Sequence, residues 1–439
     1  MNSQKLKQEA SQYLVGGVSC GWNSMKDFGA THIQKAKGSH LWDVNGKEYI
    51  DFCMGWASLF LGHNPDFYRE AFEEAYEMGL GIQYETEYQI KLAKLITEVM
   101  PSAEKVRFTN TGTESTMFAI KMARTFTGKE KIIKFEGHFH GVNDYLNFSN
   151  DAYDRLGKRF ENGTIEVLPG SAGIPKSMSE YIIALQYNDL ESFYRIIEES
   201  DDIAGVIMEP ICLASVIMFP QNNFLQKVRK ACDEKGIVLI FDEVMSGFRE
   251  RIGGVQAFCG VEADITTISK IMGCGFIISG IVGKEKYMNV LDPVGDCVAS
   301  GTNIGRLLSV IGSYKALSYL RDHEEVYAKN NENAQYFISQ ISEIGKRNHV
   351  PVVAKGWGGR TVIHLGADHL DDNYENVVNT WNKDYHFKCY HKAYEKGLYG
   401  FLMPLDICPE PITITPAHSR EDLDRALDIF DTILKTTQY

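Results

Sequence analysis

The sequence lacks an uncharged apolar run long enough to cross a bilayer, and it lacks internal repeats and low-complexity linkers. Residues 1–9 are polar and indicate the start of an amphipathic helix instead of a signal peptide. These absences argue against a membrane partner and against repeat architectures. They predict a cytoplasmic protein.

Positive charge is also scarce, because the formal net charge is −13 and no cluster of basic residues is present. Nucleic acid is therefore excluded as the main partner, since phosphate contacts need such clusters. The nine cysteines are odd in number and fall mostly in apolar segments, which is typical of reduced core residues in a cytoplasmic protein. No set of Cys, His and acidic residues recurs at ligand spacing, so no metal site is predicted.

The chain of 439 residues is too long for one simple core and favours a large domain with a smaller one. Residues 32–51 alternate in polarity around an Asn45-Gly46 turn, which predicts an antiparallel hairpin. The predicted organisation is a small-domain segment at 1–64, a large cofactor-binding domain at 65–305, and the rest of the small domain at 306–439.

Within the large domain, short apolar strands alternate with helical stretches. This alternation predicts an α/β fold with a mostly parallel sheet covered on both faces. The predicted strands are 105–109, 131–135, 205–208, 237–241, 265–268 and 278–282. Long helices are predicted at 307–320, 324–344 and 420–437, and the Gly-, Asn- and Ser-rich segment 147–178 is predicted to be a mobile loop near the site.

An amine and a carboxylate each follow the end of a predicted strand. Asp242 ends the run Ile-Val-Leu-Ile-Phe, and Lys270 ends the stretch 263–270 before a glycine-rich segment. Open α/β sheets bind ligands at the carboxyl ends of their strands, so the two side chains should meet there. A Schiff-base lysine and an aspartate on the pyridine nitrogen are the two groups that pyridoxal 5'-phosphate requires.

The segment 108–124 has the pattern of a strand, a tight turn and a helix. The free N–H groups at the helix start, with the hydroxyls of Thr111 and Thr113 beside Gly112, suit a phosphate. An ordinary N-cap and turn is an equally open interpretation.

The segment 135–141 places aromatic rings between glycines after a strand. Phe139 or His138 could stack on a flat ligand, although a strand-end turn with partly buried histidines fits the spacing as well. For Glu209, Glu243 and Arg249, supporting ion pairs or hydrogen bonds are expected.

Taken in order, these segments resemble the class III (subgroup II) aminotransferases of fold type I, and among them the glutamate-1-semialdehyde 2,1-aminomutase branch. The resemblance runs from Gly16-Gly17-Val18 nearly to the C-terminus. Its sharpest motifs are Asn110-Thr-Gly-Thr-Glu114, Lys131-Ile-Ile-Lys-Phe-Glu-Gly137, Asp242-Glu-Val-Met-Ser-Gly-Phe-Arg249, Ser269-Lys270 and Ser300-Gly-Thr302.

The resemblance implies a mostly parallel seven-stranded sheet in the large domain and an α+β small domain built from both chain ends. It assigns the Schiff base to Lys270, the pyridine nitrogen to Asp242 and cover of the ring to Phe139. It also implies that Thr111, Gly112 and Thr113 hold the phosphate. Because Thr302 matches a motif that reaches the phosphate of the other subunit, a homodimer with shared active sites is expected.

Departures from the branch guide the prediction of substrate. The aminomutase has an arginine after Gly-Gly-Val that grips the substrate carboxylate, but this chain has no arginine before Arg69. Leu213 and Ala214 stand where the aminomutase has Gly-Asn. We therefore expect an aminotransferase that moves an amino group from a small-molecule donor to a carbonyl acceptor such as a keto-sugar, with the aminomutase as the alternative. The candidate substrate residues are Trp56, Asn23, Glu410 and Arg360.

Two other classes of protein are less consistent with the sequence. A nicotinamide dehydrogenase needs a Gly-x-Gly-x-x-Gly turn after its first strand, which residues 105–113 do not supply. A cofactor-binding protein without activity could dispense with the lysine, which is present.

Overall fold

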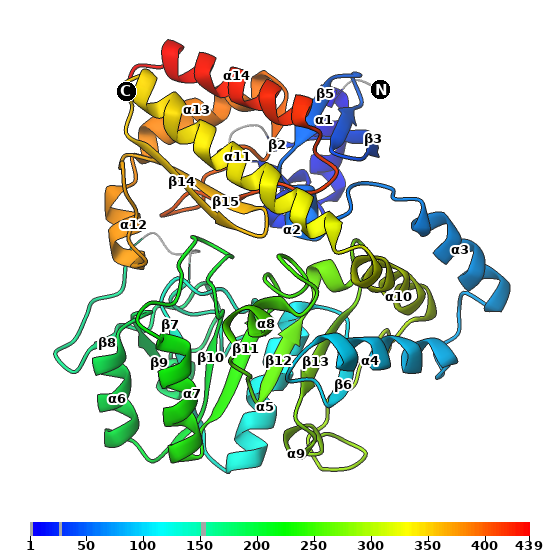
Figure 1. The fold of residues 1–439 in the computed structure, drawn as a ribbon, viewed down its shortest axis with the longest axis vertical. Coiled ribbons are helices and arrows are strands. Elements are labelled where there is room, and N and C mark those ends of the chain that lie inside the picture. Colours follow the sequence, from blue (N-terminus) through cyan, green and yellow to red (C-terminus); the bar gives the residue numbers. More distant parts are fainter. Residues whose placement is uncertain (1–2, 26–28, 151–154) are drawn as a thin grey trace.

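The structure is a computed structural model that describes residues 3–25, 29–150 and 155–439. A large α/β region built around one sheet occupies the lower half of Figure 1, and a smaller α+β region covers one end of that sheet. Both ends of the chain lie in the smaller region. No helix in the described ranges is long and apolar enough to cross a membrane.

The central sheet has the strand order β6-β13-β12-β11-β10-β7-β9-β8. Among its seven longer strands only β13 runs against the others, and β8 is a two-residue strand at the edge. The predicted mostly parallel seven-stranded sheet is therefore confirmed, with β8 added. Its strands are β6 (Lys105–Thr109), β7 (Lys131–Phe135), β8 (Thr164–Ile165), β9 (Ile182–Leu185), β10 (Ile203–Met208), β11 (Val238–Glu243), β12 (Ile265–Ile268) and β13 (Ser279–Gly283).

Helices cover both faces of this sheet, which is why its central strands are apolar at nearly every position. Along β10, Val206 joins a core that includes α6 and α7, while the next residue, Ile207, joins the core with α5 on the opposite face. The helices of this region are α3 (Phe67–Met78), α4 (Glu87–Val99), α5 (Gly112–Thr127), α6 (Leu190–Glu199), α7 (Phe224–Lys235), α8 (Gly254–Cys259) and α9 (Glu285–Met288), with the 3-10 turns η3 (Lys176–Tyr181) and η4 (Lys270–Met272).

The smaller region joins the two ends of the chain. Strand β5 pairs antiparallel with β4, as the predicted hairpin requires, and parallel with β16 from near the C-terminus. Its strands are β1 (Ser24–Met25), β2 (Gly29–Ala30), β3 (Ile33–Lys37), β4 (His40–Asp43), β5 (Glu48–Asp51), β14 (Val352–Trp357), β15 (Arg360–Leu365), β16 (Leu398–Tyr399) and β17 (Ile412–Thr413). Its helices are α1 (Ser3–Tyr13), α2 (Met54–Ala57), α11 (Glu325–Arg347), α12 (Tyr374–Thr380), α13 (Lys383–Glu395) and α14 (Arg420–Thr436), with η1 (Val15–Gly17) and η2 (Gly21–Asn23).

The helix α10 (Leu307–Asp322) shares an apolar core with α3 and α4, beside the large sheet. The exact domain boundaries stay a prediction. In the segment 147–178, residues 151–154 lie outside the described residues, whereas Phe148 and Ser149 are buried. No described residue of this segment lines the candidate site, and its predicted mobility remains a prediction.

Gly137, just after β7, offers a test of how tightly the two regions pack. It has φ +79°, and a Cβ there would collide with the ring of Tyr374 on α12. Gly137→Ala should therefore lower the free energy of unfolding by about 1–3 kcal/mol beyond the cost of the left-handed backbone alone. Gly236→Ala is the matched control, because φ is +63° and no atom lies within 4 Å of the added carbon. Equal losses for the two variants in urea denaturation would contradict this packing.

Candidate active site

A cavity of about 370 Å³ lies at the carboxyl ends of the central strands, beneath the smaller region. Nine of the residues singled out in the sequence line this cavity: Trp56, Thr111, Gly112, Thr113, Phe139, Asp242, Lys270, Arg360 and Glu410. The parallel order of β11 and β12 brings Asp242 and Lys270 to the same edge, as the strand pattern predicts.

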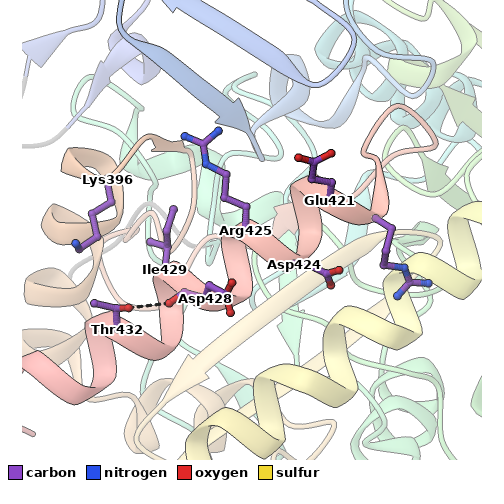
Figure 2. A pocket seen from close by; sticks show the side chains of 8 residues that line it. Lys396, Glu421, Asp424, Arg425, Asp428, Ile429 and Thr432 are labelled. Atoms are coloured by element: carbon purple, nitrogen blue, oxygen red, sulfur yellow. Dashed lines mark hydrogen bonds between the residues drawn. The ribbon is translucent and has the colours of Figure 1, made fainter.

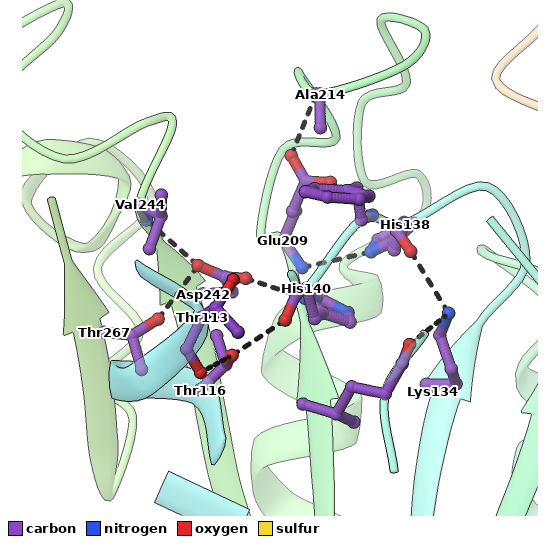
Figure 3. Close-up of polar contacts among 12 residues, drawn as sticks. Thr113, Thr116, Lys134, His138, His140, Glu209, Ala214, Asp242, Val244 and Thr267 are labelled. Carbon is purple, nitrogen blue, oxygen red and sulfur yellow. Dashed lines mark hydrogen bonds and ion pairs between the residues drawn. The ribbon is translucent and has the colours of Figure 1, made fainter. Parts of the chain in front are cut away.

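Asp242 is a buried carboxylate with fixed partners (Figure 3). Its Oδ1 accepts from Thr267 Oγ1 at 2.9 Å and from the Val244 N–H at 3.0 Å. Its Oδ2 lies 2.7 Å from Nδ1 of His140, which is fully buried. Burial lowers the pKa of His140, although Asp242 opposes this effect. A His140 ring with its proton on Nδ1 donates this hydrogen bond to the Asp242 carboxyl.

Glu209 follows β10 and holds the backbone on two sides of the cavity. It accepts from the N–H groups of Phe139 at 3.2 Å, Leu213 at 2.9 Å and Ala214 at 3.1 Å. Its own N–H donates to Nδ1 of His138 at 3.0 Å. Burial, and then the charge of Asp242, raises the pKa of Glu209 to about 8, while the three N–H groups oppose that rise. Glu209 thus has the supporting role expected for it.

The amine of Lys270 donates to the carbonyl oxygen of Trp56 at 2.7 Å. That carbonyl belongs to α2, in which all four residues have a positive φ, from +48° at Met54 to +66° at Ala57. A left-handed conformation costs about 1–2 kcal/mol for each residue other than glycine. Asp51 compensates part of this cost, because its Oδ1 accepts from the N–H groups of Cys53 and Met54.

The pKa of Lys270 is lowered to about 8. Burial is the largest cause, followed by the positive charges of Arg360 and Arg249, while Glu410 and Cys53 act in the opposite direction. An amine with such a pKa is partly unprotonated near neutral pH and can act as a nucleophile.

Arg360 is 2% exposed and lies at the start of β15. It forms an ion pair with Glu410 and donates to Thr413 Oγ1 at 3.1 Å and to the Leu213 carbonyl at 3.2 Å. Burial raises the pKa of Glu410, and Arg360 opposes that rise. Among the described residues that line the cavity, only Arg360 and Lys270 are cationic.

The wall of the cavity that the smaller region supplies is aromatic. The ring of Trp22 lies 5.6 Å from that of Trp56 and 5.7 Å from that of Phe139, measured between centroids. Trp22 was not singled out in the sequence, because a tryptophan in an irregular segment carries no pattern. Its neighbour Asn23, which was, does not line the cavity.

The phosphate-binding prediction falls on the N-terminus of α5. Thr111 is its N-cap, with Oγ1 accepting from the Glu114 N–H at 3.2 Å. A side chain at Gly112 would come within 3.0 Å of Val244, so the backbone there is close to the Asp242 loop. Thr113 Oγ1 accepts from the Val142 N–H at 3.3 Å. The N-cap interpretation and a phosphate site are thus compatible.

Thr302 lies outside the cavity and is exposed. Its carbonyl accepts from Gln83 Nε2 at 3.4 Å, on the segment between α3 and α4. A single chain does not bring Thr302 to the other candidate residues.

Other features of the molecule give less support for a functional site. A shallow hollow of about 740 Å³ on α14 is lined by exposed residues of both charges (Figure 2). Several are paired with neighbours, as Arg425 is with Glu48 at 3.6 Å and Arg420 with Glu332 at 3.8 Å. The described residues contain no group of three or more acidic, His or Cys side chains that could hold a metal ion.

His140 and Thr267 complete the set that sequence reasoning missed. Both contact Asp242 from other elements, and Thr267 sits on β12 with its side chain toward β11. These contacts depend on the strand order, which the sequence does not show. For His140 the Phe-His-Gly spacing after β7 was a signal for a residue near the site, but not for its contact with Asp242.

A lysine and a buried aspartate at the strand ends, with a helix N-terminus beside them, define a pyridoxal-phosphate enzyme of fold type I. Residues 24–434 match the class-III aminotransferases, and the chain belongs to this family. Glutamate-1-semialdehyde 2,1-aminomutase 1 of Lachnoclostridium phytofermentans is 34% identical over 440 residues, which cover 99% of each chain. The glutamate-1-semialdehyde 2,1-aminomutase of Sulfurihydrogenibium sp. is 35% identical over 436 residues, or 98% of each chain.

Solved structures agree on the fold. An omega-transaminase from Sphaerobacter thermophilus superposes with a TM-score of 0.87 at 28% identity, covering 98% of this chain and 97% of its own. A glutamate-1-semialdehyde aminomutase from Pseudomonas aeruginosa has a TM-score of 0.86 at 16% identity, covering 98% and 94%. The family establishes pyridoxal phosphate as the cofactor, and the residues around the cavity fit it.

The prediction of an aminotransferase with a carbonyl acceptor such as a keto-sugar is wrong. Relatives that match nearly the whole chain are named aminomutases, which supports the alternative. The prediction rested on the missing arginine before Arg69. The structure places Arg360, from a distant part of the chain, in the cavity wall, so a cation is present without that arginine.

The lowered pKa of Lys270 can be measured in the full-length protein freed of cofactor. Competitive labelling with an amine reagent across pH, followed by peptide mapping, should give a midpoint of about 8 for Lys270. Exposed lysines in the same digest serve as controls, and their labelling midpoints should lie at a pH of about 10.4. Labelling increases as the pH rises, because only the unprotonated amine reacts with the reagent. A Lys270 midpoint equal to that of the control peptides would refute the desolvated environment.

Proposed function

We propose that this chain is a glutamate-1-semialdehyde 2,1-aminomutase, which makes 5-aminolevulinate by exchanging an amino group and a carbonyl oxygen between neighbouring carbons. The main support is the name shared by relatives that are 31–35% identical over nearly the whole chain. The reaction needs neither a separate amino donor nor an acceptor. One cavity with one nucleophilic lysine is sufficient for it.

Lys270 and Asp242 have the central roles in this proposal. When bound, the cofactor supplies an electron-accepting ring that stabilises negative charge on the substrate carbon. Lys270 would hold the cofactor covalently, and its free amine would take and return the proton at the substrate carbon. Asp242, hydrogen-bonded to His140 and Thr267, would pair with a protonated pyridine nitrogen of the cofactor. Phe139, which also lines the cavity, would cover the ring.

Thr111, Gly112 and Thr113 would hold the cofactor phosphate. The support is their position at the start of α5, a helix of 16 residues whose first N–H groups have no intrahelical acceptor. The hydroxyl groups add donors. A phosphate held there would be anchored on α5, on the same cavity as Lys270.

Arg360 is the residue proposed to bind the substrate carboxylate. Among the described residues that line the cavity, Arg360 is the only cation besides Lys270. Its present partner is Glu410, a buried carboxyl whose pKa burial raises, and a substrate carboxylate would compete with Glu410 for the guanidinium. Trp56 and Trp22 would then pack against the carbon chain of the substrate.

A homodimer with shared sites is the second part of the proposal. The segment from α3 to α4 exposes large apolar side chains, and Figure 1 shows α3 projecting from the body. Prominent among them are Tyr76 at 74%, Tyr84 at 83% and Ile90 at 71% exposure. The same segment holds the loop of Thr302 through Gln83. A second copy covering this face would carry the partner's Thr302 toward the phosphate end of the cavity.

The reaction can be tested with a single substrate. Purified enzyme given only glutamate-1-semialdehyde should form 5-aminolevulinate, measured by a colorimetric pyrrole assay, with no added donor. Arg360→Met should raise KM by about 10- to 10²-fold, since a charge-assisted contact is worth about 1.5–3 kcal/mol. Lys355→Met, in the neighbouring strand, is the matched control. Lys270→Ala should abolish turnover. Isomerisation that depends on an added amino donor would reject the proposal.

The dimer can be tested by placing negative charges on the exposed apolar surface of α3 and α4. Tyr76→Asp combined with Ile90→Asp should convert the protein to a monomer in light scattering and weaken cofactor retention, because the phosphate loses the partner's Thr302. Tyr194→Asp on α6, also an exposed aromatic at 41%, should change neither. A wild-type protein that is monomeric with full cofactor content would contradict the shared site.

A further inference from the structure

Arg249 is a buried cation without an acidic partner. Its side chain is 0% exposed, and it forms no ion pair with any residue in the described ranges. Its Nε donates to the Met245 carbonyl at 2.6 Å and its Nη2 to the Ala57 carbonyl at 2.7 Å. Its Nη1 has no hydrogen-bond partner among the described residues. Such a group is expensive to bury, so its charge requires an explanation.

Three parts of the site meet at this guanidinium. Arg249 ends the segment that begins with Asp242, near the end of β11. Its contact with Ala57 reaches α2 in the smaller region. It also supports the turn between β14 and β15, because a side chain at Gly358 would lie 2.7 Å from Arg249 Cγ. Arg360 follows that turn by two residues.

The contact with α2 connects Arg249 to Lys270. The carbonyl of Trp56 accepts the hydrogen bond from the Lys270 amine at 2.7 Å, and the next carbonyl, that of Ala57, accepts from Arg249. Two consecutive carbonyls of a left-handed turn are therefore held by two cations. Arg249 and Lys270 thus both hold this costly conformation from the side of the large region.

We propose that Arg249 is a positioning residue for Lys270, holding the turn that orients the amine and placing an unpaired positive charge near it. A buried methionine or leucine could fill the same volume without the desolvation cost. The charge itself is therefore the feature that a purely structural role leaves unexplained.

The groups around the amine support this assignment. Arg360, Glu410, Cys53 and Arg249 are the charged or titratable side chains that act on Lys270. Arg360 has the larger effect of the two arginines and is paired with Glu410, whereas Arg249 pairs with no acid among the described residues. Burial, with a smaller effect of Arg360, lowers the pKa of Arg249 to about 9, which leaves it charged at neutral pH. A like charge nearby favours the unprotonated amine.

The test compares variants by the pH dependence of Lys270 labelling in full-length protein freed of cofactor. R249M removes the charge and should raise the labelling midpoint by about one pH unit, and R249Q should do the same. R249K keeps the charge and should keep the low midpoint. R251M is the matched control, since Arg251 lies in the same segment but is exposed and pairs with Glu250 at 2.6 Å. Thermal denaturation of each variant verifies folding.

Each outcome decides the role of Arg249. An unchanged midpoint in a folded neutral variant overturns the assignment, and so does a shift in R249K as large as in R249M. If neither R249M nor R249Q folds, Arg249 serves the fold alone and the assignment also fails. The inference rests on Lys270 as the point of cofactor attachment. Borohydride reduction of the loaded wild-type enzyme and peptide mapping check that separately, because a label elsewhere rejects the proposed function while leaving the midpoints intact.

Discussion

Charge buried at the carboxyl ends of the central strands is the constraint on which the site depends. Lys270, Asp242 and Arg360 lie in a cavity between two packed regions, where an unpaired charge is costly. Each therefore has a specific partner: a turn carbonyl for the lysine, His140 and Thr267 for the aspartate, and Glu410 for the arginine. These partners come from different elements, so packing of the two regions and chemistry at the site cannot be separated.

The strain in α2 follows from the same constraint. Four consecutive residues adopt left-handed angles so that the Trp56 carbonyl faces the Lys270 amine. Asp51 stabilises the turn from within the smaller region, and Arg249 stabilises it from the large one. A costly backbone at a functional site persists only when the surroundings hold it from several sides. Function at Lys270 is thus linked to the interface between the regions.

Several features could be predicted because they depend on local pattern. The apolar runs before Asp242 and Lys270 indicate buried parallel strands, and parallel strands end at one edge of a sheet, so the meeting of the two side chains follows. The short strand β9 was not predicted, because its four residues offer too little periodicity. The choice of substrate was predicted wrongly from the absence of an arginine near the N-terminus. A cation can enter a cavity from any segment of the chain that the fold brings there.

By itself, the sequence determined the fold class, the cofactor and the two groups of opposite charge at the strand ends, because hydrophobic periodicity and motif order are local properties. Only the tertiary structure decided which side chains surround them. His140 comes from the segment after β7 and Arg249 from a turn that closes on α2, and only the fold shows that the candidate Arg360 lies in the same cavity as Lys270. Contacts between residues far apart in the chain depend on how strands are ordered and how the two regions pack, and no local pattern encodes that arrangement.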